Sequence, residues 1–354
     1  MDTLLCHGRR RLLGAAGAFG ALALAGCTES RPPPPAATSG QRFSGQTMGG
    51  SYTVRLAGAA LSPARLDRLQ ADVQDALDAV DQRMSLYRPD SELMRFNRHA
   101  ASTPLALSPE LMTVLHAGQQ VAELSGGAFD VTVAPLVLAW GFGSEARHGL
   151  PDAAVLQQRR ANTGHRHLEL DAARGLATKH LPGLQADLGG IAKGYGVDRA
   201  AAVLQAQGCA HYMVEVGGEL RTAGRNAQGR PWQIGIEEPD AVPQRARLVV
   251  PLSGAAMATS GDYRIYFEEG HRRYSHEIDP KSGEPIAHGL ASVTVVAADC
   301  MQADALATAL IVMGPGAGLV LARQQGIAAH FIVRQPGGGL VDIATEAFAV
   351  LRGA

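Results

Sequence analysis

The stretch DLGGIAKGYGVD, residues 187–198, places a carboxylate, a glycine pair, a lysine and further glycines close together. Glycine lets the backbone turn tightly or approach a ligand closely. Two interpretations follow. The stretch binds a polyphosphate together with a metal ion, or it forms a tight turn from a strand into a helix with no ligand. The apolar residues Val197 and Leu204 favour a helix that begins after the glycine pair.

Three further helical regions are indicated by their sequence pattern. Apolar residues recur at intervals of three and four from Leu66 to Met84, after a Ser-Pro pair that is typical of a helix N-terminus. A second helix is expected over residues 108–124, where a Ser-Pro pair begins it and a glycine pair ends it. Another covers residues 303–313, is broken by the sequence GPG and is followed by a short helix.

Strands are predicted where β-branched or alternating apolar residues concentrate. The stretches are YMVEV (212–216), WQIGI (232–236), ARLVVPL (246–252), RYSHEI (273–278), ASVTVVA (291–297) and AHFIVR (329–334). They cluster in the second half of the chain, and the helices occur in blocks rather than in regular alternation. This favours an α+β fold, a single large domain with a mixed or antiparallel sheet flanked by helices, over a doubly wound fold.

Residues 1–26 have the anatomy of an export signal, because a run of arginines precedes an uncharged stretch too short to span a bilayer comfortably. The sequence LAGC ends at Cys27 and resembles a lipoprotein box, so we expect cleavage before Cys27 and lipidation of its side chain. Ordinary cleavage nearby, with a free Cys27, is the alternative. Residues 27–44 then form a proline-rich tether and residues 45–354 the folded domain. The expected product is an exported, membrane-anchored lipoprotein that faces the periplasm.

Composition excludes some functions. The formal net charge is −1 and no long basic run is present, so nucleic acid is not an expected partner. Beyond Cys6 and Cys27 the chain contains Cys209 and Cys300, which can form one disulfide but need not do so. The sequence has no CxxC motif and no Cys/His cluster, so a structural zinc site is not expected.

Several single residues carry possible chemistry. Asp304 and Thr308 are four residues apart in ADALATAL, on one helical face, where they can offer two hard oxygens to one Mg²⁺. A solvated or capping role is the alternative for such a pair. On its own, His276 in a predicted strand suits a half-buried structural imidazole, and Tyr87 and Phe129 suit the core.

Taken in order, the motifs resemble the ApbE family, the FAD:protein FMN transferases, from about Met48 to Val333. The resemblance is carried by MGGSY (48–52), MSLYRPDSELMRFN (84–97), GGAFDVTVAPL (126–136), WGFG (140–143), ADLGGIAKGYGVD (186–198), VGGELRTAGRN (216–226), ATSGDY (258–263), YSHEIDPKSGEP (274–285) and SVTVVAADCMQADALATAL (292–310). It implies a single ApbE-like, T-fold-like domain.

The resemblance also implies an activity. Members of this family bind FAD and Mg²⁺, move the FMN portion onto a Ser or Thr of a target protein and release AMP. The implied acceptor carries a flavinylation Ser/Thr motif and is a membrane-bound redox subunit. Two alternatives stay open: a pyrophosphatase that splits FAD into FMN and AMP, and a flavin-binding lipoprotein without enzymatic activity.

Site residues follow from the same resemblance. The implied FAD contacts are Met48, Tyr87, Ala128, Phe129, Asp130, Asp187, Lys193 and Ile278. The implied metal ligands are the Gly190 carbonyl, Asp304 and Thr308, and His276 resembles the family's base. Lys193 can meet diphosphate charge, whereas Asp187 suits an adenosine or ribose contact. This chain departs from the usual pattern at Gly50, where Thr is commoner, at Ser282, where Thr is usual, and at Glu277, which replaces an aliphatic residue.

Overall fold

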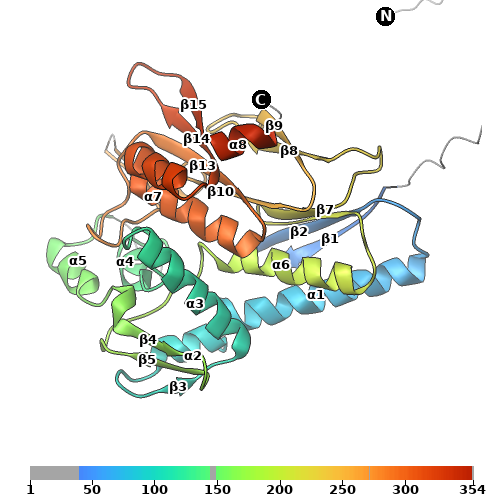
Figure 1. Ribbon diagram of the computed structural model, residues 1–354. Helices are drawn as coiled ribbons and strands as arrows, with labels where there is room; N and C mark the ends of the chain where they lie inside the picture. The colour runs from blue at the N-terminus through green and yellow to red at the C-terminus, as the bar shows by residue number, and fades with distance from the viewer. Residues whose placement is uncertain (1–39, 144–148, 271, 353–354) are drawn as a thin grey trace, which may run out of the picture. The chain divides into compact units, whose positions relative to one another are not determined.

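The computed structural model describes residues 40–143, 149–270 and 272–352 (Figure 1). The predicted signal and Cys27 therefore lie outside the described residues. Strand β1 (Gln41–Thr47) begins four residues before the predicted start of the domain at residue 45. The side-chain amide of Gln41 exchanges two hydrogen bonds with the backbone of Leu61, and Phe43 is buried. These contacts fix the chain before residue 45.

An eight-stranded antiparallel sheet forms the centre of this part of the chain. Its strands, in spatial order, are β1, β2 (Gly50–Leu56), β6 (Tyr212–Val216), β7 (Glu219–Ala223), β10 (Ala256–Gly261), β13 (Leu290–Ala297), β14 (Ala328–Arg334) and β15 (Leu340–Ala344). Nearly every residue of β13 is buried, as expected for a strand covered on both faces.

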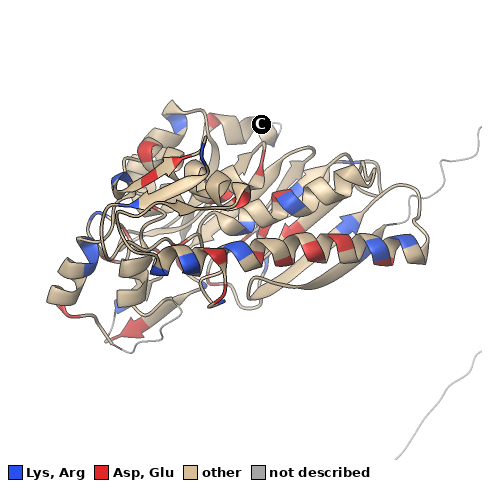
Figure 2. Cartoon of the chain, turned by 90° about the horizontal axis from the view of Figure 1, so that it is seen from below, with Lys and Arg blue, Asp and Glu red and all other residues tan. Residues whose placement is uncertain are grey.

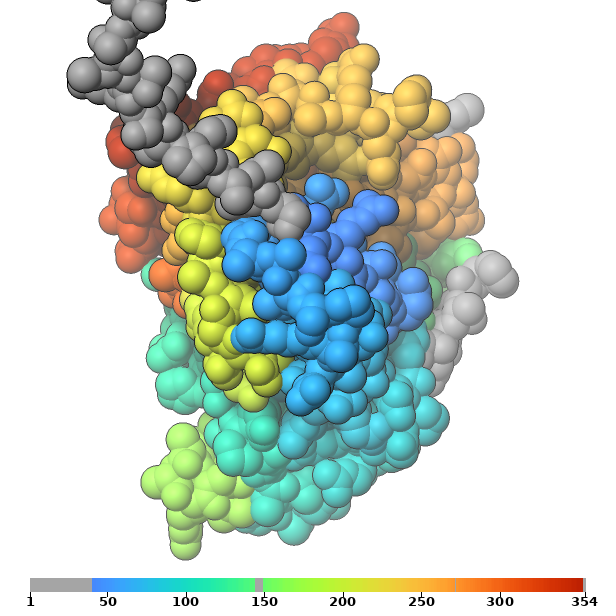
Figure 3. All heavy atoms as spheres, turned by 90° about the vertical axis from the view of Figure 1, so that its right-hand side faces the viewer, coloured from blue at the N-terminus to red at the C-terminus, as the bar shows by residue number. Residues whose placement is uncertain are grey.

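Three long helices cover one face of the sheet (Figure 1). They are α1 (Pro63–Met84), α6 (Ala192–Ala206) and α7 (Cys300–Gln324). Space-filling spheres show α1 beside α6 and the first strands (Figure 3). Charges of both signs line the solvent side of α1 (Figure 2), while its apolar positions face the sheet and α6.

The opposite face is covered by the hairpin β8 (Trp232–Glu237) and β9 (Ala246–Leu252) together with α8 (Glu346–Leu351). The remaining elements complete the described part of the chain. They are α2 (Glu92–Arg98), α3 (Pro109–Leu124), α4 (Ala134–Ala139), α5 (Ala153–Arg160), the 3-10 turn His165–His167, a small sheet of β3 (Leu105–Ala106), β5 (Leu176–Lys179) and β4 (Leu168–Asp171), and the hairpin β11 (Tyr266–Glu269) and β12 (Arg272–Ser275).

The predicted helices are confirmed, including the interruption after residue 313. Gly314 has φ 77° and ψ 177° inside α7, and Pro315 follows it, so the helix kinks there. One predicted strand is too long: β12 ends at Ser275, because the chain turns back at Ile278, which forms a bridge with Pro285. Helix α7 is apolar enough to cross a membrane by length and composition, but half of its most apolar window is buried inside the protein, as in a core helix.

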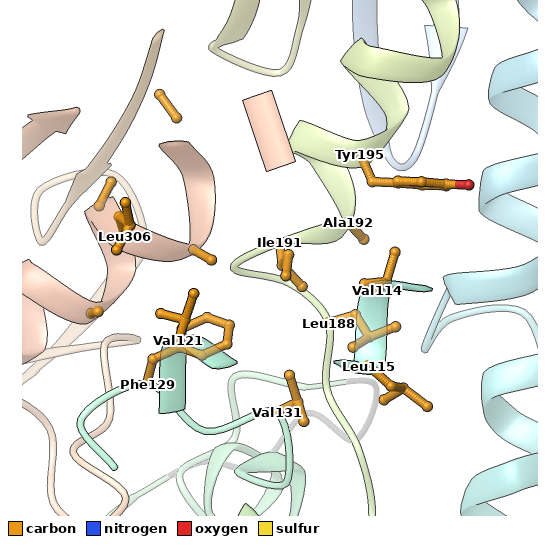
Figure 4. Packing of buried hydrophobic residues seen from close by; sticks show 14 of the residues in the cluster. Val114, Leu115, Val121, Phe129, Val131, Leu188, Ile191, Ala192, Tyr195 and Leu306 are labelled. Atoms are coloured by element: carbon orange, nitrogen blue, oxygen red, sulfur yellow. The ribbon is translucent and has the colours of Figure 1, made fainter. Parts of the chain in front are cut away.

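The 187–198 stretch turns into helix α6 at Ala192, without a strand directly before it. Leu188 and Ile191 are buried in a core that also contains Val121 of α3, Phe129 and Leu306 of α7 (Figure 4). Burial of such side chains contributes roughly 1.5–3 kcal/mol each. The core therefore anchors this turn on both sides, against α3 and against α7.

Candidate active site

Helices α6 and α7 meet at Gly194 and Asp304. The backbone N–H of Gly194 donates a hydrogen bond to Oδ2 of Asp304 (2.9 Å). A Cβ atom at position 194 would overlap the carbonyl oxygen of Cys300, so only glycine allows the helices to approach this closely. The contact places the first turn of α6 against the buried Asp304 carboxylate.

A second contact ties the two helices together at the start of α7. The carboxylate of Asp198, the last residue of the 187–198 stretch, accepts hydrogen bonds from the N–H groups of Cys300 (2.9 and 3.0 Å) and Met301 (2.9 Å). Arg221 of β7 donates to the same carboxylate. Asp198 thus caps α7 and joins it to the sheet.

Buried charges gather around Lys193. Its ammonium lies 2.5 Å from Oε1 of Glu219, whose side chain is 3% exposed and whose other oxygen has no hydrogen-bond partner among the described residues. Burial lowers the pKa of Lys193, but the charges of Glu219 and then Asp304 outweigh it, so the pKa lies above the ordinary value. Burial raises the pKa of Asp304 to about 7, opposed by Lys193 and reinforced by Glu219 and Glu277.

This cluster has an excess of negative charge. Three buried carboxylates, Glu219, Asp304 and Glu277, interact with the single ammonium of Lys193. An arrangement of this kind is relieved when a divalent cation binds. The described residues contain no group of three or more His, Cys, Asp or Glu side chains that could hold a metal ion, so a cation here would also need hydroxyl or carbonyl oxygens.

Among the predicted metal ligands, Asp304 and Thr308 supply such oxygens on one helix. Asp304 and Thr308 lie one turn apart on α7. Gly190 faces Thr308, since a Cβ at position 190 would be 2.8 Å from Thr308 Oγ1. Ser260 of β10 lies 3.1 Å from the same oxygen through its own Oγ. One carboxylate, hydroxyl groups and a backbone carbonyl are the hard donors that Mg²⁺ takes, so the residues fit this ion.

His276 follows β12 and is held by the hairpin. Its backbone N–H donates to the carbonyl oxygen of Ile265 (3.2 Å), and its Nδ1 lies 3.1 Å from the same oxygen. Its other ring nitrogen, Nε2, is 3.7 Å from Oε1 of Glu277. The edge of the Phe142 ring lies against the imidazole, with the ring centroids 6.4 Å apart.

Asp187 interacts electrostatically with both His276 and Tyr87. Burial raises the pKa of Asp187, while the hydrogen bond from Gly189 N–H (2.7 Å) and then the charge of His276 lower it. Burial and then the charge of Asp187 raise the pKa of Tyr87, although the whole residue is 71% exposed.

Comparison with known proteins identifies the family of this chain. A model of the ApbE family matches residues 48–331. The chain is 41% identical over 336 residues to a FAD:protein FMN transferase of Haemophilus influenzae, covering 94% of this chain and 95% of that relative.

Two solved structures agree. The flavin transferase ApbE of Vibrio cholerae has a TM-score of 0.81 and 42% identity, over 89% of this chain and 99% of that one. The Pseudomonas stutzeri flavinyl transferase ApbE, in its apo form, has a TM-score of 0.82 and 42% identity, over 90% and 98%. This chain belongs to the ApbE family. The resemblance in the sequence and the α+β fold are therefore confirmed.

Other family-motif residues shape the walls of the site. Met48 and Gly49 form the turn between β1 and β2 with positive φ values of 47° and 73°. Positive φ is strained for Met, and it places the Met48 side chain against α6, where a Cβ at Gly196 would be 2.6 Å from its methyl carbon. Ile278 is buried beside Trp140 and Tyr274.

In the GGAFD motif, Ala128 and Phe129 are buried, and Asp130 holds the turn. One carboxylate oxygen of Asp130 accepts hydrogen bonds from the N–H (2.8 Å) and hydroxyl (2.6 Å) of Thr132, and the other accepts from His165 N–H (2.8 Å). The Asp130 side chain is thereby occupied by hydrogen bonds within the protein.

Sequence reasoning assigned no role to Glu219, Ser260 or Asp198. Glu219 directly follows a glycine pair in VGGELR, and Ser260 lies in ATSGDY, so both belong to motifs that were recognised. Their partners, Lys193 and Thr308, are separated from them by 26 and 48 residues. Only the fold shows these pairs.

Proposed function

We propose that this protein transfers the FMN portion of FAD to a Ser or Thr hydroxyl of an acceptor protein, with Mg²⁺ and with release of AMP. One observation supports this most strongly. Lys193 interacts with the Asp304 carboxylate, which lies one helical turn from Thr308, in a chain that is 41% identical to a FAD:protein FMN transferase over 94% of its length. Storage of a flavin would not require a base such as the one proposed at His276.

FAD is expected to lie across the Gly190 turn. Met48, Tyr87, the Ala128–Phe129–Asp130 turn, Asp187 and Ile278 are proposed as its contacts. We propose that Lys193 faces the diphosphate. The carboxylates of Glu219 and Asp304 keep its pKa above the ordinary value, so the ammonium stays protonated and positively charged. Asp187 suits a hydroxyl donor better than a phosphate, since like charges repel.

The reaction follows from these positions. The acceptor hydroxyl loses its proton to Nε2 of His276 and attacks the phosphorus on the FMN side of the diphosphate. The new oxygen–phosphorus bond forms as the bond to the AMP oxygen breaks, and AMP leaves with that oxygen. Lys193 stabilises the charge that develops on the phosphate oxygens. Mg²⁺, held by Asp304, Thr308 and the Gly190 carbonyl, would supply Lewis-acid stabilisation of the same charge.

The experiment combines the protein with FAD, Mg²⁺ and a purified acceptor domain that carries a flavinylation Ser/Thr motif. Intact-mass analysis should show the acceptor heavier by one FMN, with an equal amount of AMP. An acceptor with Ala at the modified position is the control. FMN and AMP without acceptor modification would instead identify a pyrophosphatase. If FAD stays intact, the protein binds the flavin without enzymatic activity.

The proposed base has its own test. His276→Ala should retain FAD but transfer FMN on the order of 10²–10⁴-fold more slowly, because general-base assistance is lost. The wild-type rate should rise with pH and then level off, and the variant should lose this rising limb. A near-native rate with the same limb would remove His276 from the chemistry.

The location of the activity is also a proposal. The LAGC sequence supports a lipid anchor at Cys27, on a periplasmic membrane surface, where a membrane-bound redox subunit would be the acceptor. Cys27→Ser should release the protein into the soluble envelope fraction while FAD binding persists. Continued membrane fractionation of this variant would exclude the lipid anchor.

A further inference from the structure

Glu277 carries a carboxylate that is buried beside His276. The residue is 8% exposed, and its Oε1 lies 3.7 Å from Nε2 of His276. Its backbone is fixed on both sides: its N–H donates to Ser275 Oγ (3.1 Å), and its carbonyl accepts from Ile286 N–H (2.9 Å). A buried carboxylate costs free energy unless a positive group compensates it.

The hydrogen bond at Nδ1 of His276 shows which form of the ring nitrogen Nε2 lies next to Glu277. The Ile265 carbonyl, 3.1 Å from Nδ1 of His276, can only accept a hydrogen bond. Nδ1 therefore carries the hydrogen, and Nε2 is the nitrogen with a free lone pair in the neutral ring. Glu277 lies on the side of the nitrogen that would take a proton.

The two side chains also sense other charges. His276 interacts with Asp187 as well as with Glu277. Glu277 interacts with His276, Lys193, Asp262 and Asp304. Burial raises the pKa of Glu277, and the charges of His276 and then Lys193 lower it. Among the described residues of this set, Glu277 is the one for which an ion-pair distance to the His276 ring is seen.

We propose that Glu277 is a positioning residue that stabilises the imidazolium formed when His276 takes the acceptor proton. The proton leaves the hydroxyl and binds Nε2, and the positive ring then stands next to the Glu277 carboxylate. No further bond is made or broken by Glu277. This inference rests on the proposed function, since it assumes that His276 is the base.

The test compares Glu277→Gln with the wild-type protein in full FMN transfer to the acceptor domain, at saturating FAD and Mg²⁺. The amide keeps the shape but removes the charge. We expect kcat to fall on the order of tenfold with the KM for FAD unchanged. The rising limb of the pH–rate profile should move to lower pH by roughly half a unit to one unit, because an anion no longer favours the protonated ring.

Two variants serve as controls. Glu284→Gln makes the same charge change at an exposed position of the same loop and should leave the limb in place. Glu277→Asp keeps the negative charge but holds it farther from His276, because the side chain is shorter. The rising limb of its pH–rate profile should therefore lie between those of the wild type and Glu277→Gln. If Glu277→Gln does not fold, Glu277→Asp alone decides, through the same shift.

The two hypotheses fail differently. One outcome overturns the role of Glu277 alone: the rising limb of the pH–rate profile disappears in His276→Ala but does not move in Glu277→Gln or Glu277→Asp. A limb that survives in His276→Ala overturns the base, and with it this inference. An NMR titration of the His276 ring gives a readout independent of transfer: its midpoint should move to lower pH in Glu277→Gln, and an unmoved midpoint overturns the inference.

Discussion

The carboxylate of Asp198 on α6 accepts hydrogen bonds from the backbone of Cys300, the first residue of α7, at 2.9 and 3.0 Å. This side chain, together with the N-cap Asp299, whose carboxylate accepts a hydrogen bond from Gln302 N–H, fixes the start of the helix that carries Asp304 and Thr308. The position of the proposed metal ligands depends on a residue that is itself outside the site.

Asp198→Ala should therefore destabilise the protein and weaken Mg²⁺-dependent turnover. It removes one of the two carboxylates that cap the N-terminus of α7, at a cost of about 0.5–2 kcal/mol, and leaves Arg221 without its carboxylate. Chemical denaturation with and without Mg²⁺ measures the free energy of unfolding. Asp67→Ala, at an exposed position of α1, is the control and should change it little. Equal stability of the two variants would contradict the capping role.

Gly194→Ala should disturb the contact between α6 and α7. The added methyl group would overlap the Cys300 carbonyl, so the helices must separate, at a cost of about 1–3 kcal/mol. Gly316→Ala is the matched control: it is exposed in α7, and its Cβ would meet no atom within 4 Å. Thermal unfolding should show a lower Tm for Gly194→Ala only. A native Tm for that variant would show that the helices can shift freely.

Asp304→Asn should separate metal dependence from folding. The amide oxygen can still accept the hydrogen bond from Gly194, so the Mg²⁺-free protein should remain folded. The anionic metal ligand is lost, so turnover at limiting Mg²⁺ should fall by about 100-fold or more. A Mg²⁺ titration of the transfer rate measures this, with Asp75→Asn on the exposed side of α1 as control. An unchanged Mg²⁺ dependence would exclude Asp304 from the site.

His330 should make the protein less stable in mild acid. Its side chain is 3% exposed, its Nε2 lies 3.1 Å from Asp342, and its ring stacks on Phe348. Burial lowers the pKa of His330 more than Asp342 raises it. The unfolded chain, with an ordinary value of about 6.5, then binds the proton more readily.

The free energy of unfolding should therefore be fully retained above about pH 6.5 and fall as the pH decreases towards the folded-state pKa of His330. His330→Phe keeps the ring stack and removes the titrating group, so it should lose less stability between about pH 7.5 and about pH 5 than the wild type. Urea denaturation at both pH values measures the difference. Parallel losses in the two proteins would show that other groups cause the effect.

Long apolar patterns made much of the fold predictable. The apolar spacing in α1 and the mostly apolar, β-branched sequence of β13 are set by burial, so the sequence alone shows them. Strand β10, AMATSG, consists mostly of small and polar residues, and it is a strand because β7 and β13 pair with it on either side. The two residues of β3 are too few for any pattern.

The pairs of residues in the candidate site were likewise predictable in one case and not in another. Asp304 and Thr308 could be paired from their spacing on one helix, whereas the partner of Lys193 could not. Glu219 is polar and follows two glycines, which suggests an exposed turn, yet its side chain is 3% exposed. Burial of a charge depends on what the rest of the chain packs around it, and this information is absent from a local pattern.

Helix α1 has a consequence for reach. It spans 22 residues, about 33 Å at a rise of 1.5 Å per residue. The chain enters at the start of α1, where Gln41 binds Leu61, and Tyr87 follows the other end. For the tether proposed above, α1 is thus a rigid element of about this length between Gln41, where β1 begins, and Tyr87. An acceptor has to reach a site that lies about one helix length from the point where the tether joins the fold.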